Sequence, residues 1–95
     1  MILRMYSMKD RLSGFAPMIP FTTDELARRY FTDQFLGNVI VNNHPEDFSI
    51  HYCGDFDTET GNFEGIRGET GTPQLIMEGK ELEERGNKNT IQNRL

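Results

Sequence analysis

The stretch HPEDFSIHYCGDFDTETG, residues 44–61, decides the fold and contains both histidines, the single cysteine and five acidic residues. Its apolar side chains fall on even numbers, namely Phe48, Ile50, Tyr52 and Phe56. Its polar side chains fall on odd numbers, namely Ser49, His51, Cys53, Asp55 and Asp57. Successive side chains of a strand point to opposite faces, so this alternation predicts a half-buried strand with one apolar and one polar face. The sequence DTETG at 57–61 predicts a turn, after which Phe63 begins a returning arm.

Three further segments predict the rest of a small sheet. Residues 2–9 mix apolar and polar side chains with β-branched and aromatic members, which is typical of a strand. Residues 10–14 predict a turn ending at Gly14, and the two prolines in residues 15–20 make this segment at best an irregular edge strand. Residues 74–78 predict a last strand, after a glycine-rich loop at 64–73.

The clearest predicted element is a helix over residues 23–36. Thr22 and Glu25 fit a capping box, and Gly37 is suited to a left-handed conformation after the last turn. Apolar side chains recur at helical spacing and form one face, consisting of Leu26, Ala27, Tyr30, Phe31 and Phe35. The following residues, 39–41, have the sequence VIV and predict a short extended piece.

These elements predict an α+β fold, with one central helix packed on a small antiparallel sheet. The apolar strand face, which includes Phe48, Ile50, Tyr52 and Phe56, is expected to meet the apolar helix face. We expect a single domain over residues 1–82 and a polar C-terminal tail over residues 83–95. A chain of 95 residues with an apolar share of 36% has a modest core, so we also expect a homodimer or higher homo-oligomer.

The net charge of −5 is unevenly distributed along the chain. Residues 1–36 carry five basic and four acidic side chains, whereas residues 37–95 carry five basic and eleven acidic ones. An acidic protein is a poor sequence-independent DNA binder, because neutralisation of phosphates supplies most of that affinity. Any nucleic-acid contact must therefore come from a local patch.

Cysteine usage and hydropathy limit the class of protein further. A single cysteine excludes an intramolecular disulfide, which suits the bacterial cytoplasm. No apolar run approaches the roughly 18 residues of a membrane span. The first ten residues lack the long apolar segment of a signal peptide. We therefore expect no association with a membrane.

Metal binding and catalysis are the first functions to weigh in residues 44–61. His51, Cys53 and Asp55 are expected on one strand face, but side chains two apart on a strand are roughly 6–7 Å apart. A zinc site needs three or four close ligands, and the chain has no second cysteine. Cys53 has histidines nearby, but nothing in the sequence positions an oxyanion hole. We expect no metal, no cofactor, no catalytic residue and no enzymatic activity.

A nucleic-acid surface is the next candidate. The predicted first hairpin mixes cations with aromatic rings, namely Arg4, Tyr6, Lys9, Arg11 and Phe15. Such a mixture suits single strands, because bases stack on rings and cations follow the phosphates. Arg28 and Arg29 could add charge from the solvent side of the helix. The alternative is that both rings belong to the core and the cations only confer solubility, which the residue pattern alone favours.

An ordered set of short segments resembles the small nonstructural protein of gokushoviruses, circular single-stranded DNA phages of the microvirus family. The matching segments are MYSMKDR at 5–11, GF at 14–15, HPEDF at 44–48, YCGDFD at 52–57, TG at 60–61 and PQLI at 73–76. The resemblance implies a protein of the host bacterial cytoplasm that is absent from the mature virion. It also implies a role in genome replication that favours single-stranded genome synthesis, often with DNA binding.

Two binding modes follow from the resemblance and the charge distribution together. In the first, the basic and aromatic hairpin binds single-stranded DNA. In the second, the acidic middle of the chain docks on a phage or host replication protein and alters its activity. Either mode describes a non-enzymatic replication accessory protein.

Overall fold

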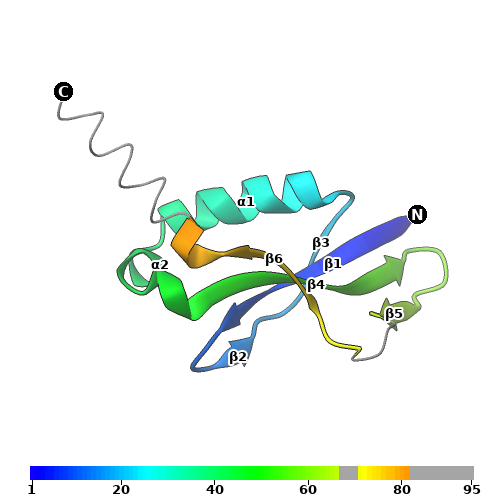
Figure 1. The fold of residues 1–95 in the computed structure, drawn as a ribbon. Helices are drawn as coiled ribbons and strands as arrows, with labels where there is room; N and C mark the ends of the chain where they lie inside the picture. Colours follow the sequence, from blue (N-terminus) through cyan, green and yellow to red (C-terminus); the bar gives the residue numbers. More distant parts are fainter. Residues whose placement is uncertain (67–70, 82–95) are drawn as a thin grey trace.

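The structure is a computed structural model that describes residues 1–66 and 71–81 (Figure 1). Its elements in chain order are β1 (Ile2–Asp10), β2 (Gly14–Phe15), β3 (Ile19–Phe21), α1 (Asp24–Leu36), α2 (Val39–Asn43), the 3-10 turn η1 (Pro45–Asp47), β4 (Phe48–Asp57), β5 (Phe63–Gly65) and β6 (Gln74–Glu78). An antiparallel sheet with α1 on one face confirms the predicted α+β fold. The predicted tail at 83–95 lies outside the described residues. Among the described residues, no helix combines the length and the apolar character that crossing a bilayer requires.

The long strands β1 and β4 form the antiparallel centre of the sheet. The short strands β2 and β3 both pair with the free edge of β1, which confirms the irregular edge predicted from the prolines. The strands β5 and β6 both pair with the other edge of β4. Short edge strands limit the row of unpaired backbone groups that an edge presents to other chains.

The helix α1 closes the core over one face of this sheet. Ala27, Phe31 and Phe35 are buried and join a core cluster that includes Ile50 of β4 and Met77 of β6. The predicted partners Leu26 and Tyr30 are partly exposed, so the buried stripe of the helix is narrower than expected. Aromatic rings of α1 continue this packing, since Phe35 meets Phe48 with ring centroids 6.3 Å apart.

The helix predicted at residues 23–36 is confirmed to within one residue, but both of its predicted caps need correction. The N-cap is Thr23, whose hydroxyl accepts a hydrogen bond from the Leu26 amide at 3.2 Å. Thr22 lies one residue too early for that role, because the helix begins at Asp24. Gly37 ends the helix with φ −87°, an ordinary right-handed conformation, so the expected left-handed glycine was wrong.

Residues 39–41 are helical, which contradicts the prediction of an extended piece. Asn38 caps the short helix α2, because its side-chain oxygen accepts from the amides of Ile40 and Val41 at 2.9 and 3.2 Å. Val41 is buried, whereas Val39 and Ile40 are largely exposed. A local cap and one core contact therefore override the strand preference of three β-branched residues.

A β-bulge at Cys53 divides β4 into two parts. The pairing with β1 is regular from Asp10 opposite Phe48 to Tyr6 opposite Tyr52, and it resumes with Met5 opposite Gly54. Cys53 is the extra residue on β4, so the side chains beyond it exchange faces relative to a regular strand.

Two faces of the sheet are defined by this register. The helix face carries Tyr6 and Ile50 and packs against α1, and the outer face is the opposite one. Beyond the bulge, Asp55 pairs with Arg4 on the helix face, and Phe56 pairs with Leu3 on the outer face. The predictions that Phe56 packs toward the helix and that Asp55 shares a face with His51 were therefore wrong.

Gly54 makes the bulge possible. Its φ of +147° is a conformation that side-chain-bearing residues rarely adopt. A Cβ atom at this position would lie 2.2 Å from the carbonyl oxygen of Glu64 and 2.9 Å from the Cα of Gly65. The close approach of β5 to β4 thus requires glycine.

Candidate nucleic-acid interface

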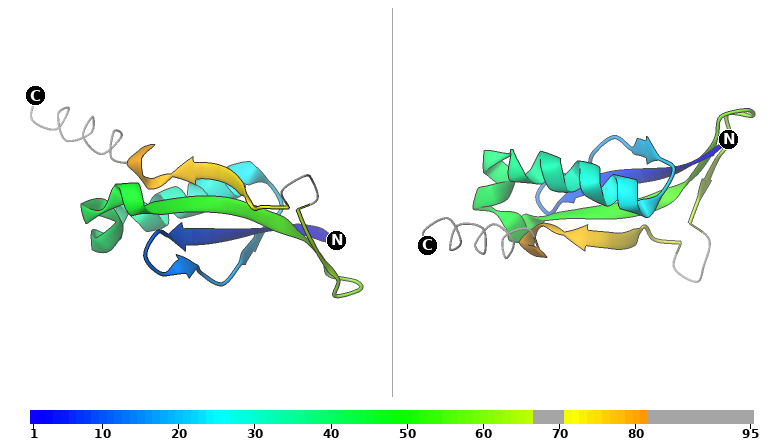
Figure 2. Two further views of the ribbon diagram at one scale, coloured as in Figure 1. Left: turned by 60° about the horizontal axis from the view of Figure 1, so that its bottom comes forward. Right: turned by 90° about the horizontal axis from the view of Figure 1, so that it is seen from above.

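The outer face of the sheet mixes apolar and aromatic side chains with polar ones, and α1 lies behind it in the left view of Figure 2. Residues that are paired across strands share a face. The register therefore places on the outer face Leu3, Met5, Ser7, Lys9, Phe15, Ser49, His51, Phe56, Phe63, Leu75 and Glu78. Phe15, Phe63 and Leu75 are each close to half exposed. Asp55 and Asp57 are not on this face, because the bulge turns both carboxylates to the helix face.

One end of the outer face brings together a cation, an aromatic ring and a histidine. Lys9 Nζ lies 5.4 Å from the centroid of the Phe15 ring, within the range of a cation–π contact. The Phe15 ring meets the His51 ring edge-on, with centroids also 5.4 Å apart. His51 Nε2 is 2.9 Å from the Ser49 hydroxyl. This arrangement offers an exposed ring for stacking beside a positive charge.

A groove of about 370 Å³ opens beside this cluster. Its charged lining residues are Lys9, Arg11, Lys80, Glu46, Asp47 and Glu78. Arg11 Nε is paired with Asp47 at 2.8 Å, and Lys80 Nζ is paired with Glu78 at 3.2 Å. Lys9 makes no ion pair within the described part of the chain, so its charge is available to a ligand.

Phe56 and Phe63 form a second aromatic position at the other end of the outer face. They are directly paired across β4 and β5, and Phe63 is the more exposed of the two. Along β1 the two positions correspond to Leu3 and Lys9, which are roughly 20 Å apart at about 3.3 Å per residue. A single strand that stacks on both positions would therefore have to cross the whole outer face.

Arg4 and Tyr6 lie on the helix face and are engaged in a polar network. Arg4 Nε donates to the Tyr6 hydroxyl at 2.9 Å, and its Nη2 pairs with Asp24 Oδ1 at 3.1 Å. The Tyr6 hydroxyl donates to the same carboxylate, which lowers the pKa of Asp24 with help from Arg4. Tyr6 is fully buried, so its ring is not accessible to a base.

The network extends across the sheet to Tyr52 and Asp55. The Arg4 guanidinium lies 3.9 Å from the centroid of the Tyr52 ring. The Tyr52 hydroxyl donates to Asp55 Oδ1 at 2.6 Å. Burial, and secondarily this hydrogen bond, raises the pKa of Tyr52 to about 12, so the phenol stays protonated. Arg4 and Tyr6 thus connect the sheet to Asp24 at the start of α1, and Tyr52 and Asp55 extend the network along β4.

The remaining predicted cations are exposed but separated. Arg11 lies at the rim of the groove, where its side chain and its backbone N–H both bond to Asp47. Arg28 and Arg29 are exposed on α1, on the opposite layer of the molecule from Lys9 and Phe15. The structure therefore brings together Lys9, Phe15 and Arg11, and it separates them from the other four predicted residues.

Acidic side chains collect on the helix face of the β4–β5 hairpin. Asp55 is paired with Glu64 across the two strands, and Asp57 precedes the turn that carries Glu59. Backbone N–H groups of the turn, first that of Glu59, lower the pKa of Asp57. The hairpin thus presents negative charge on the side of the sheet that faces away from Lys9.

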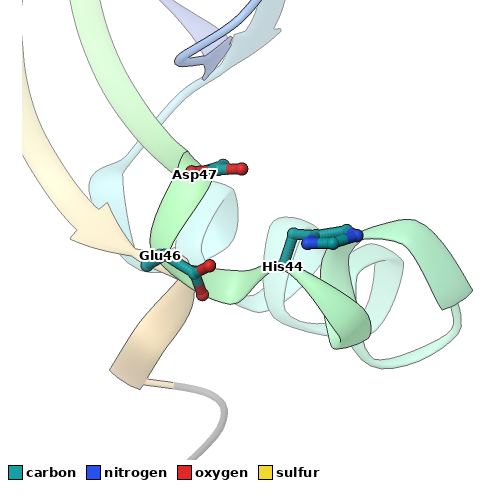
Figure 3. A group of neighbouring side chains, drawn as sticks. All are labelled: His44, Glu46 and Asp47. Carbon is teal, nitrogen blue, oxygen red and sulfur yellow. The ribbon is translucent and has the colours of Figure 1, made fainter.

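Two other groups of reactive residue types have different surroundings. One ligand atom each from His44, Glu46 and Asp47 lies within 4.8 Å of the others at η1 (Figure 3). The Asp47 carboxylate already pairs with Arg11, and that positive charge opposes binding of a cation. Burial raises the pKa of the Cys53 thiol, which disfavours the nucleophilic thiolate.

Sequence analysis did not select His51, Phe56 or Phe63 for the interface. The sequence indicated His51 only as a possible metal ligand or as a possible base beside Cys53. It placed Phe56 in the core, because the even-numbered alternation continues through it. The available signal was Cys53-Gly54 in the middle of a strand, since a glycine inside a strand pattern suggests a bulge or a close backbone approach.

Comparison with known proteins identifies the family of the chain. No curated protein and no solved structure matches it. A family model described as Phage ORF5 protein matches residues 3–82, which include every described strand and helix apart from the first residue of β1. The chain therefore belongs to the Phage ORF5 protein family.

Proposed function

We propose that this phage protein is a non-enzymatic accessory of genome replication that binds single-stranded DNA on the outer face of its sheet. The resemblance to the gokushovirus nonstructural protein supports the assignment to a microvirus and the preference for single-stranded genome synthesis. The protein would act in the host bacterial cytoplasm and would be absent from the mature virion. Its partners would be single-stranded DNA and, through it, the replication machinery.

The observation that carries this proposal is the separation of charges by the bulge at Cys53. The outer face presents exposed rings at Phe15 and Phe63, with Lys9 beside the first. The hairpin carboxylates that would repel phosphate, Asp55 and Asp57, lie on the other face. A sheet face with exposed rings is a common platform on which single-stranded nucleic acids stack their bases.

The same residues limit the strength of binding. Among the described residues, the cations near the outer face are Lys9, Arg11 and Lys80, and the last two are already paired with carboxylates. Each phosphate contact contributes roughly 0.7 to the salt slope for a single strand, so a slope of about 1–2 is expected. Stacking, at about 1–3 kcal/mol per base, would supply most of the affinity.

A fluorescence anisotropy titration with a labelled oligonucleotide, at several salt concentrations, tests the proposal. Lys9→Ala with Arg11→Ala should weaken binding and lower the slope by roughly 0.7 for each phosphate contact that is lost. Arg28→Ala with Arg29→Ala removes the same charge from the helix side and should leave binding unchanged. Phe15→Ala should weaken binding with the slope unchanged, because stacking releases no counterions.

Two outcomes would contradict the proposal. Wild-type protein that binds no oligonucleotide at low salt would remove DNA as a ligand. Equal losses in the two double variants would show that binding follows total charge and not the outer face.

The acidic hairpin supports a second candidate function, docking on a phage or host replication protein. Asp55 and Glu64 are adjacent on one face, and Glu59 is exposed in the turn. A basic surface on a replication protein would complement this group. A pulldown from infected cells, with and without nuclease, separates the two candidate functions. Capture of a replication protein that survives nuclease, but is lost in the double variant Glu59→Gln with Glu64→Gln, would favour protein docking.

A further inference from the structure

His51 lies between the two sides of the groove on the outer face. It pairs with Ser7 on one side and with Leu75 on the other, and its ring contacts Phe15. Its Nε2 is within hydrogen-bonding distance of Ser49 Oγ, which also lines the groove. Its Nδ1 is buried and has no hydrogen-bond partner of good geometry within the described residues.

These contacts indicate what protonation of the ring would do. A neutral ring with its proton on Nδ1 has that N–H beside the Pro73 carbonyl, and its Nε2 accepts from the Ser49 hydroxyl. A protonated ring donates from both nitrogens, and the nearby carbonyl of Pro73 favours that form. Nε2–H would then donate to Ser49, whose own O–H would be free to donate into the groove.

We propose that the groove beside His51 is a phosphate subsite, and that His51 takes up a proton when a phosphodiester binds between it and Lys9. This inference rests on the proposed binding of single-stranded DNA to the outer face. It adds a contact, formed by His51 and Ser49, and it makes DNA affinity depend on pH.

The charged groups around His51, taken over the part of the chain that the structure describes, affect this linkage. Burial lowers the pKa of His51 below its usual 6.5, and repulsion between Lys9 of β1 and the imidazolium lowers it further. Arg11, Lys80, Glu46, Asp47 and Glu78 complete the charged lining of the groove. Phe15 and Leu75 are its neutral neighbours on β2 and β6. A phosphate that binds near Lys9 would offset the repulsion and raise the pKa of His51.

The sign of the pH effect follows from linkage. If bound DNA raises the pKa of His51, affinity increases as pH falls through the pKa of the complex and levels off below the pKa of the free protein. Each unit of difference between the two pKa values gives a tenfold gain in affinity at low pH. A rise of about one unit would give roughly two- to sixfold tighter binding at pH 5.5 than at pH 7.5.

The chain offers a matched control, because its only other histidine is His44. Anisotropy titrations with a labelled oligonucleotide between pH 5.5 and 7.5 would compare the wild type with His51→Gln and His44→Gln. Glutamine keeps a polar group for Ser49 but does not titrate. We expect pH-dependent affinity in the wild type and in His44→Gln, and a flat profile in His51→Gln.

Proton NMR gives a second readout that is independent of affinity. The ring signal that disappears in His51→Gln should titrate with a midpoint below 6.5 in the free protein, and saturating oligonucleotide should raise that midpoint. Binding with unchanged affinity across the pH range, or a midpoint that oligonucleotide does not move, would overturn the phosphate subsite and leave the proposed function intact. No binding at any pH would overturn both.

Discussion

The glycine at the bulge provides the sharpest test of the fold, through Gly54→Ala. The new Cβ would lie 2.2 Å from the Glu64 carbonyl oxygen, and the backbone φ of +147° would itself disfavour alanine. Backbone strain in such a region costs about 1–3 kcal/mol. The clash with β5 adds to this cost, because the added Cβ meets backbone atoms of Glu64 and Gly65, which cannot move aside as the end of a flexible side chain could.

A matched control isolates the steric part of the cost. Gly61 also has a positive φ, +77°, but an added Cβ meets nothing within 4 Å there. Gly61→Ala should therefore reduce the free energy of unfolding only by the cost of placing alanine in a left-handed conformation, about 1–2 kcal/mol. We expect Gly54→Ala to reduce the free energy of unfolding by about 3 kcal/mol or more.

Thermal unfolding followed by circular dichroism measures both variants. For a domain of this size, 1 kcal/mol shifts Tm by about 4–8 °C, so the expected loss for Gly54→Ala is about 12–24 °C. If the strain is released locally, β5 should detach first and the segment around residues 54–65 should become sensitive to limited proteolysis. Equal Tm values for Gly54→Ala and Gly61→Ala, with equal resistance to protease, would refute the close approach of β5 to β4.

Three further predictions concern the helix start, the polar network and assembly. Thr23→Ala should reduce the free energy of unfolding by about 1 kcal/mol in denaturant titrations, and Thr22→Ala should leave it nearly unchanged, because only Thr23 caps α1. Because the pKa of Asp24 is lowered from its usual 3.8, the carboxylate contributes to stability above pH 3.8, and this contribution is lost as pH falls through the lowered pKa. The difference in free energy of unfolding between the wild type and Asp24→Asn should therefore shrink in acid. A difference that grows in acid would contradict the network. Light scattering at micromolar concentration should give a mass above the 11.0 kDa of one chain, since Val39, Ile40 and the outer face leave apolar surface exposed. A mass equal to that of one chain would count against self-association.

Sequence reasoning could identify α1 and β4 because each has a strong, regular period, and β1 because of its β-branched and aromatic side chains. Ala27, Phe31 and Phe35 repeat at helical spacing, and Phe48, Ile50 and Tyr52 alternate, so core-facing positions are specified locally. The bulge could not be located in this way, since an apolar residue on every second position is compatible with a regular strand. Only the pairing of β4 with β1 and the space around Gly54 determine where the extra residue goes.

The candidate interface was predicted only in part for the same reason. Lys9 and Phe15 could be grouped because a short hairpin places them opposite each other. Arg4 and Tyr6 seemed equivalent to them in sequence, but even-numbered positions of β1 face the helix, where Asp24 binds both side chains. His51 and Phe63 join the interface through pairings between distant segments, which no local pattern contains.

The central pairing of β1 with β4 has a consequence for how the chain folds. The two strands lie almost half the chain apart, and α1 lies between them in the sequence. During synthesis β1 emerges first but has no long partner until β4 follows, roughly 2–10 s later at 5–20 residues per second. Because closing such a long loop precedes most of the sheet contacts, folding should be slow for a domain of this size. In that interval β2 and β3 can pair with one edge of β1, so the short hairpin covers that edge, and the edge that later receives β4 stays open to pairing with other chains.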